Sequence, residues 1–135
     1  YLHSTGFRRD HLLYGMHRIR PSCRQAYLVE GFMDVQRLDA YGYPNVLGMM
    51  GAYLSIDQIN MLRAFASVMV VPDGDKPGYE AAAKAAKELS AKGTVARVSQ
   101  MPFGKDPDDL TIAQALDILG PPPETVIDVD GASAN

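Results

Sequence analysis

Four short apolar segments alternate with four segments of helical character, and this alternation constrains the fold more than any other feature of the sequence. Each apolar segment has the length of a buried strand. These segments are residues 26–29, 45–48, 67–71 and 94–99. The helical segments are residues 32–41, 56–65, 77–92 and 109–119. Strands that alternate with helices predict an α/β fold, with a mainly parallel sheet of about four strands flanked by helices on both faces.

Local signals mark several helix ends. Ser55 and Gln58 form a capping-box pattern, in which the serine oxygen accepts the third helical N–H and the glutamine reaches back to the serine N–H. Pro77 suits the first turn of the third helix, and Gly93 ends that helix. We expect Asp109 to be the N-cap of the last helix and not a metal ligand.

The length suits a single globular domain, because the chain has 135 residues and 47% of them are hydrophobic. We expect three parts: a basic lead-in from an upstream segment at residues 1–24, the main domain at residues 25–119, and a proline-rich break with a tail or linker at residues 120–135. Since the chain begins at Tyr1, in polar and basic sequence, we interpret it as a fragment of a longer protein.

Composition excludes several classes of protein. The single cysteine, Cys23, excludes a disulfide framework and a zinc ribbon, so no zinc is expected in this fragment. No apolar run approaches the roughly 20 residues of a membrane span. No secretory signal pattern stands at the start of the sequence. We therefore expect a cytoplasmic protein without a membrane partner.

The formal net charge of −3 hides an asymmetry along the chain. Residues 1–24 contain five arginines and one acid, a balance of +4, whereas residues 25–135 contain eight bases and fifteen acids. A basic segment of this kind is a candidate for contact with the phosphates of a nucleic acid. Arginines on a solvated helix face would give the same pattern, so both interpretations stay open.

Carboxylates follow three of the four predicted strands. They are Glu30 and Asp34, Asp73 and Asp75, and Asp106 and Asp108. In an open parallel sheet, sites form beyond the carboxyl ends of the strands, so these side chains should meet at one edge. Carboxylates gathered there repel one another, and a hard divalent cation such as Mg²⁺ is the usual remedy. Two such ions can clamp the attacking and leaving oxygens of phosphoryl transfer. The pattern therefore predicts a metal-dependent phosphoryl or nucleotidyl transfer site.

Simpler explanations account for less of this pattern. A single Asp-x-Asp pair after a strand is weak evidence, because helix caps and solvated loops explain most such pairs. Three acidic strand ends at one edge are harder to explain in that way. The segment from Asp73 begins like an EF-hand calcium loop, but Lys84 stands at the twelfth position, where a bidentate glutamate is required. No Gly-x4-Gly-Lys-Ser/Thr phosphate loop is present.

Several segments closely resemble those of bacterial-type DNA primases. Residues 28–35, LVEGFMDV, are similar to the VEGYMDV segment of that family. Residues 71–82, VPDGDKPGYEAA, resemble its DGDxAGxxAA segment, and residues 103–110, FGKDPDDL, resemble its GKDPDEL segment. Residues 12–17 resemble its LYGL stretch, and residues 47–55 resemble its LGTxLT turn. The resemblance covers about residues 11–119 in the expected order, with Ala52 where the family often has threonine and Pro77 in place of a small residue.

The resemblance implies the TOPRIM fold, which primases share with topoisomerases and some nucleases. It also implies that the acidic residues bind two Mg²⁺ or Mn²⁺ ions, with a catalytic role for four of them: Glu30, Asp34, Asp73 and Asp75. The metal-binding set is Glu30, Asp34, Asp73, Asp75, Asp106 and Asp108. Glu30 either ligates metal or accepts the hydroxyl proton. Candidates for contact with nucleotide or template are Arg18, Arg20, Arg24, Lys76 and Lys105.

The activity implied by the resemblance is the synthesis of short RNA primers during DNA replication. The partners would be a single-stranded DNA template, ribonucleoside triphosphates and the growing RNA–DNA primer, in a bacterium, plasmid or phage. A replicative helicase would bind through regions outside this fragment, and the family's zinc-binding domain would lie upstream. The alternatives are another TOPRIM enzyme, either a topoisomerase or a nuclease, and a non-catalytic TOPRIM module that binds a partner protein.

Overall fold

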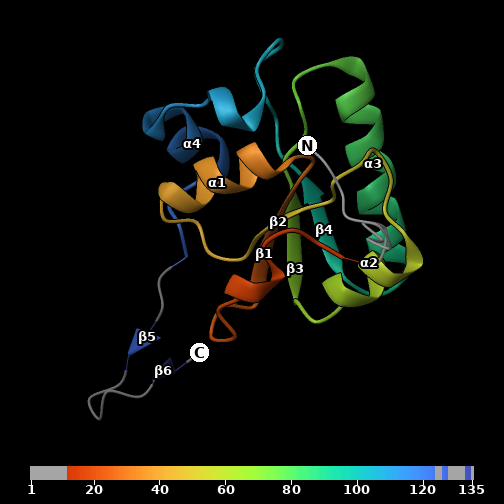
Figure 1. The fold of residues 1–135 in the computed structure, drawn as a ribbon, viewed down its shortest axis with the longest axis vertical. Coiled ribbons are helices and arrows are strands. Elements are labelled where there is room, and N and C mark those ends of the chain that lie inside the picture. The colour runs from red at the N-terminus through yellow and green to blue at the C-terminus, as the bar shows by residue number, and fades with distance from the viewer. Residues whose placement is uncertain (1–11, 124–125, 128–132, 135) are drawn as a thin grey trace, which may run out of the picture.

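A central sheet of four parallel strands organises the domain, in the order β2-β1-β3-β4 (Figure 1). The computed structural model describes residues 12–123, 126–127 and 133–134. The strands are β1 (Gln25–Val29), β2 (Val46–Gly48), β3 (Ser67–Val70) and β4 (Val95–Val98). Every pairing within this sheet is parallel, so the predicted α/β architecture is confirmed. Arg8 and Arg9 of the basic lead-in lie outside the described residues.

Helices cover both faces of the sheet, as the sequence predicts (Figure 1). The helices are α1 (Phe32–Ala40), α2 (Ile56–Leu62), α3 (Lys76–Ala91) and α4 (Ile112–Leu119). Successive strand residues point to opposite faces, so neighbours on β1 enter different cores. On one face, Leu28 packs in a cluster with Leu62 of α2 and Leu89 of α3. On the other face lies a cluster of Tyr27, Leu38 of α1 and Ala115 of α4.

The caps of the helices confirm one local prediction and correct another. The capping box of α2 is present, with Gln58 N donating to Ser55 Oγ over 3.1 Å and Ser55 N donating to Gln58 Oε1 over 2.9 Å. The predicted N-cap of the last helix, Asp109, is wrong, because Thr111 caps α4. Asp109 instead ends a short 3-10 helix, η3 (Pro107–Asp109), and accepts from Asp106 N over 2.9 Å. Leu110 is extended, and this break separates η3 from α4.

The lead-in is attached to the sheet at the amino-terminal edge by one buried side chain. Asn45, which is 5% exposed, donates to the carbonyl oxygens of Cys23 (2.9 Å) and Gln25 (3.1 Å) and accepts from Arg20 N (2.7 Å). The short 3-10 helix η2 (Met16–Arg18) lies in this lead-in. Its Arg18 pairs with Asp39, at the end of α1, over 3.0 Å.

After α4 the chain continues through the predicted proline-rich break. Beyond it, β5 (Val126–Ile127) and β6 (Ser133–Ala134) pair as a small antiparallel sheet. Among the described residues, no helix combines the length and apolar character needed to cross a membrane.

Candidate metal and nucleotide site

All six predicted acidic residues lie on segments that leave the carboxyl edge of the sheet. They are Glu30 and Asp34 after β1, Asp73 and Asp75 after β3, and Asp106 and Asp108 after β4. This edge is at the top of Figure 1, where the connection from β3 to α3 and the loop after β4 lie. The order of strands brings the segments after β1 and β3 next to each other, with the segment after β4 beyond them.

Asp73 is a buried acid that faces several other carboxylates at this edge. Burial, the charge of Glu30 and a hydrogen bond shared with it raise the pKa of Asp73 to about 7, and the charges of Asp106 and Asp34 add to the effect. Within the described part of the chain, Asp73 Oδ1 is buried without a hydrogen-bond partner. A buried carboxylate oxygen that faces other carboxylates and lacks a donor is stabilised either by a proton or by a cation.

Asp34 has a different environment from Asp73. It is 7% exposed, and both carboxylate oxygens accept backbone N–H groups: Oδ1 from Asp108 over 2.9 Å and Oδ2 from Gly31 over 3.4 Å. Burial raises the pKa of Asp34 to about 6, although these two hydrogen bonds oppose the shift. Asp34 therefore joins the segment after β1 to the segment after β4, and its oxygens are already used by the protein.

Asp75 is the N-cap of α3. Its Oδ1 accepts from Gly78 N over 2.6 Å, and the same residue is the N-cap from which the helix leaves the edge. A Cβ at residue 78 would lie 2.9 Å from Asp75 Oδ1 and would also collide with the carbonyl oxygen of Asp73. Glycine at position 78 therefore allows the helix to start close against both aspartates.

Gly74 fixes the segment after β3 against the loop after β4. Gly74 N donates to the carbonyl oxygen of Lys105 over 2.8 Å, and Gly104 N donates to the carbonyl oxygen of Gly74 over 2.7 Å. A Cβ at residue 74 would collide with the carbonyl oxygens of Pro102 and Lys105. This close approach brings Asp106 within electrostatic range of the other acids, and burial together with the charges of Asp109 and Asp75 raises its pKa.

Arg37 is a site-proximal residue that sequence reasoning missed. Its Nε lies 3.5 Å from Asp108 Oδ1 and donates to the Asp108 carbonyl oxygen over 3.2 Å. The guanidinium also lies 5.9 Å from the ring centroid of Tyr41. Arg37 follows Asp34 by three residues on α1, so the two share a helix face, and this spacing was the available signal. Both residues hold the loop that carries Asp108. Asp34 accepts from the Asp108 amide, and Arg37 contacts the Asp108 carbonyl oxygen and carboxylate.

The acidic edge fits a hard divalent cation. In the described residues, no group of three or more histidine, cysteine or acidic side chains is already close enough to hold a metal. Mg²⁺, however, keeps several waters and is typically bound by one or two carboxylates together with substrate phosphates. The available donors are carboxylate oxygens, and the partnerless Asp73 Oδ1 beside Glu30 is one that a cation would stabilise. The residues therefore fit a cation whose binding is completed by a phosphate ligand.

The predicted basic residues divide between the two edges of the sheet. Lys76 is the first residue of α3 and Lys105 belongs to the loop after β4, so both lie at the acidic edge. Arg18, Arg20 and Arg24 precede β1 and lie at the opposite edge, beside Asp39, Asn45 and the start of β3 respectively. The structure does not bring these three arginines to the acidic residues. Their contact with nucleotide or template therefore stays a prediction.

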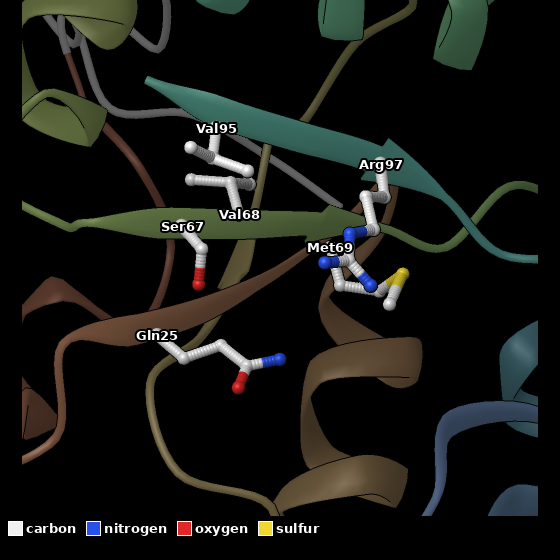
Figure 2. A pocket seen from close by; sticks show the side chains of 6 residues that line it. All are labelled: Gln25, Ser67, Val68, Met69, Val95 and Arg97. Carbon is white, nitrogen blue, oxygen red and sulfur yellow. The ribbon is translucent and has the colours of Figure 1, made fainter.

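A hollow on the sheet is separate from the acidic edge. It has a volume of about 130 Å³ and lies over β1, β3 and β4 (Figure 2). The side chains that line it are Gln25, Ser67, Val68, Met69, Val95 and Arg97. None of them is an acid, so this hollow is not the predicted metal site.

The fold and the edge together define a class: a parallel α/β domain with carboxylates gathered where phosphate-handling sites form. A family model described as Toprim-like matches residues 27–111. The chain belongs to the Toprim-like family, and its relatives identify it as a Toprim domain of the DnaG-type DNA primases. Domains of this family generally bind divalent metal ions.

Comparison with individual proteins gives the same result. The chain is 39% identical to the DNA primase of Geobacillus stearothermophilus over 106 residues, which are 76% of this chain and 18% of that protein. A DNA primase domain from Pseudomonas aeruginosa superimposes with a TM-score of 0.70 at 31% identity, over 84% of this chain and 37% of the other. A DnaG primase catalytic domain bound to single-stranded DNA superimposes with a TM-score of 0.64 at 29% identity, over 79% and 37%. The chain thus spans about a fifth of the length of the curated primase it matches.

Proposed function

We propose that this domain is the nucleotidyl-transfer centre of a DNA primase, which makes short RNA primers on single-stranded DNA during replication. The observation that carries the proposal is the pairing of Asp73 with Glu30 at the carboxyl edge of the sheet, next to Asp106. These carboxylates lie close to one another, and their negative charges repel. Such a site favours the binding of cations together with the phosphates that accompany them. The family match and the solved complex of a similar catalytic domain with single-stranded DNA support the same activity.

Within this proposal the acidic residues have different roles. Glu30, Asp73 and Asp106 would hold Mg²⁺ or Mn²⁺, with Asp75 contributing through the oxygen that does not cap α3. When bound, two such ions supply the positive charge that triphosphate and an attacking 3′-hydroxyl require. Glu30 either ligates a metal or accepts the hydroxyl proton. Asp34 would keep the acidic segments together through backbone N–H groups, and Asp108 would be held by Arg37.

Basic residues would bind the phosphates of the two nucleic-acid ligands. Lys76 and Lys105 are at the acidic edge, so they would contact the ribonucleoside triphosphate or the primer end. Arg18, Arg20 and Arg24 are at the other edge, so they would contact only more distant parts of a template. A replicative helicase would bind outside this chain, and a cytoplasmic location follows from action on replicating DNA.

Primer synthesis by the longer parent protein tests the proposal. We expect Asp73→Asn to reduce the rate of RNA synthesis on single-stranded DNA by more than about 100-fold, since changes outside the first coordination sphere of metal sites already cost about 10- to 100-fold. Asp117→Asn, an exposed change on α4, is the matched control and should retain the rate. Full activity of Asp73→Asn would refute the assignment. DNA cleavage without primer synthesis by the unmodified protein would instead indicate a nuclease.

A further inference from the structure

The most exposed large apolar side chain among those described stands beside the acidic edge. Phe103 is 91% exposed, at the tip of the loop that follows β4. This loop projects at the top of Figure 1, between β4 and η3. Single exposed apolar residues are common on protein surfaces, so exposure alone gives Phe103 no function. Its position and its support are what distinguish it.

The backbone around Phe103 is fixed. Lys105 N donates to the carbonyl oxygen of Pro102 over 3.2 Å, which closes a four-residue turn with Phe103 in its second position. Gly104 occupies the third position with a φ of 79°, as a type II turn requires. Gly104 N also donates to Gly74 over 2.7 Å, so the turn is attached to the segment that carries Asp73. The ring of Phe103 is therefore presented by a turn that is bonded to the proposed metal site.

The chemistry of the ligand explains why an aromatic ring is useful at this position. If the acidic edge and Lys105 bind cations and phosphates, the base attached to those phosphates lies nearby and still needs an apolar surface. Nucleobases stack on exposed aromatic rings without requiring a particular sequence, since every base has a π-face. We propose that Phe103 is a stacking surface for a nucleobase bound at the acidic edge, from either the template strand or the incoming nucleotide. This inference rests on the proposed function, since it takes the same site to bind a nucleotide.

A protein partner fits the surroundings of Phe103 less well. Hot spots of protein interfaces are ringed by further contacts that exclude water. The chain neighbours of Phe103 are instead the exposed Pro102 and Gly104, followed by Lys105 and Asp106. A single ring two residues before a lysine and three before a proposed metal ligand suits a base with its phosphate better than it suits an apolar protein surface.

The absence of tryptophan from the sequence allows a direct test. Phe103→Trp introduces the only tryptophan of the 135-residue chain, and its fluorescence is quenched when a base stacks on the indole. Val95→Trp is the matched control, because Val95 is 57% exposed but begins β4, at the opposite end of the strand from the loop. With Mg²⁺ present, we expect quenching of Phe103→Trp by ligand and none of Val95→Trp.

Four ligands distinguish the two sources of the base. Quenching by an oligodeoxynucleotide but not by an abasic strand of the same length would assign the template base. Quenching by a ribonucleoside triphosphate but not by inorganic triphosphate would assign the incoming nucleotide. No quenching by any of the four, at concentrations up to about 1 mM, would overturn the proposal.

Affinity measurements complete the test and separate it from the proposed function. We expect Phe103→Ala and Phe103→Leu each to weaken binding of the assigned ligand by about 5- to 150-fold, since stacking requires an aromatic ring. Wild-type affinity in Phe103→Leu would overturn the proposal and indicate a merely apolar contact. In the parent protein, Phe103→Ala should raise KM and leave kcat near its wild-type value. If the parent makes no primers but base-dependent quenching persists, the proposed function fails and the stacking surface stands.

Discussion

Replacing Gly74 with alanine would separate two acidic segments without removing any carboxylate. The backbone of Gly74 exchanges hydrogen bonds with the loop after β4, through Lys105 O (2.8 Å) and Gly104 N (2.7 Å). A Cβ at this position would collide with the carbonyl oxygens of Pro102 and Lys105. Because both obstacles are backbone atoms, a rotamer change cannot relieve the contact, and the loop must move away from Asp73.

The expected loss of stability follows from those two hydrogen bonds. A typical intramolecular hydrogen bond contributes about 0.5–1.5 kcal/mol net, so losing both costs about 1–3 kcal/mol. With an m-value of about 1–3 kcal/mol/M, the urea midpoint should fall by about 1 M. Displacement of the loop also moves Asp106 and Lys105 from Asp73, so the affinity for Mn²⁺ should fall by about tenfold or more.

Urea unfolding and Mn²⁺ titration, read by calorimetry or electron paramagnetic resonance, measure these two effects. Gly51→Ala is the matched control, because no atom lies within 4 Å of a Cβ at that position. We expect Gly51→Ala to stay within about 0.5 kcal/mol of the wild type. If Gly74→Ala also stays within that range and binds Mn²⁺ with wild-type affinity, the two segments are not held together as described, and the reasoning is refuted.

Three further predictions concern the pH dependence of stability, the role of Asp34 and the role of Asn45. Because the pKa values of Asp34 and Asp73 are raised to about 6 and about 7, the native chain holds protons that the unfolded chain has released above about pH 4. The free energy of unfolding in EDTA should therefore fall as the pH rises from about 5 to about 8, and Mg²⁺ should restore part of it at the higher pH. Asp34→Ala should accelerate hydrogen exchange at the amide of Asp108, whereas Asp34→Asn, which can keep one acceptor, should largely preserve it. Asn45→Ala should cost about 3 kcal/mol in urea unfolding, because it leaves buried backbone groups without partners and places alanine at a φ of 54°.

Each of these three has a clear opposite result. A free energy of unfolding that rises with pH in EDTA would mean that other groups of the protein already stabilise the negative charges of Asp34 and Asp73. Unchanged exchange at Asp108 in Asp34→Ala, with lost Mn²⁺ binding in Asp34→Asn, would make Asp34 a metal ligand. A cost below about 1 kcal/mol for Asn45→Ala would show that water replaces its hydrogen bonds.

Most of the fold was predictable, because it depends on local patterns. Short apolar runs between helical segments identify the strands, and the Ser55–Gln58 pair identifies the start of α2. The placement of all six acids at one edge follows from the general rule for parallel sheets. The cap of α4 was missed because Pro107 begins a separate 3-10 turn, and the competition between Asp109 and Thr111 depends on the backbone of Leu110.

The sequence did not predict which of the acids are bonded to other groups of the protein. Asp34 accepts from the amide of Asp108, which lies 74 residues further along the chain. Arg37 reaches Asp108 across a similar separation of 71 residues. Motif spacing describes which residues share an edge, but long-range hydrogen bonds decide which oxygens the protein itself already uses.

That division bears on which carboxylates a cation would stabilise. Three of the acids have partners that are not acids: Asp34 and Asp75 accept from backbone amides, and Asp108 lies beside Arg37. Asp73 instead faces the charges of Glu30, Asp106 and Asp34, and Asp106 faces those of Asp109, Asp75 and Asp108. The hydrogen bonds and the ion pair favour the charged forms of Asp34, Asp75 and Asp108, although burial still raises the pKa of Asp34 to about 6. For Asp73 and Asp106, burial and the charges of neighbouring carboxylates act together to raise the pKa. A divalent cation favours the charged form of a carboxylate, and Mg²⁺ is typically held by one or two carboxylates together with phosphate ligands. The pattern of partners therefore favours Asp73, whose Oδ1 has no hydrogen-bond partner among the described residues, as the acid that a cation would stabilise most.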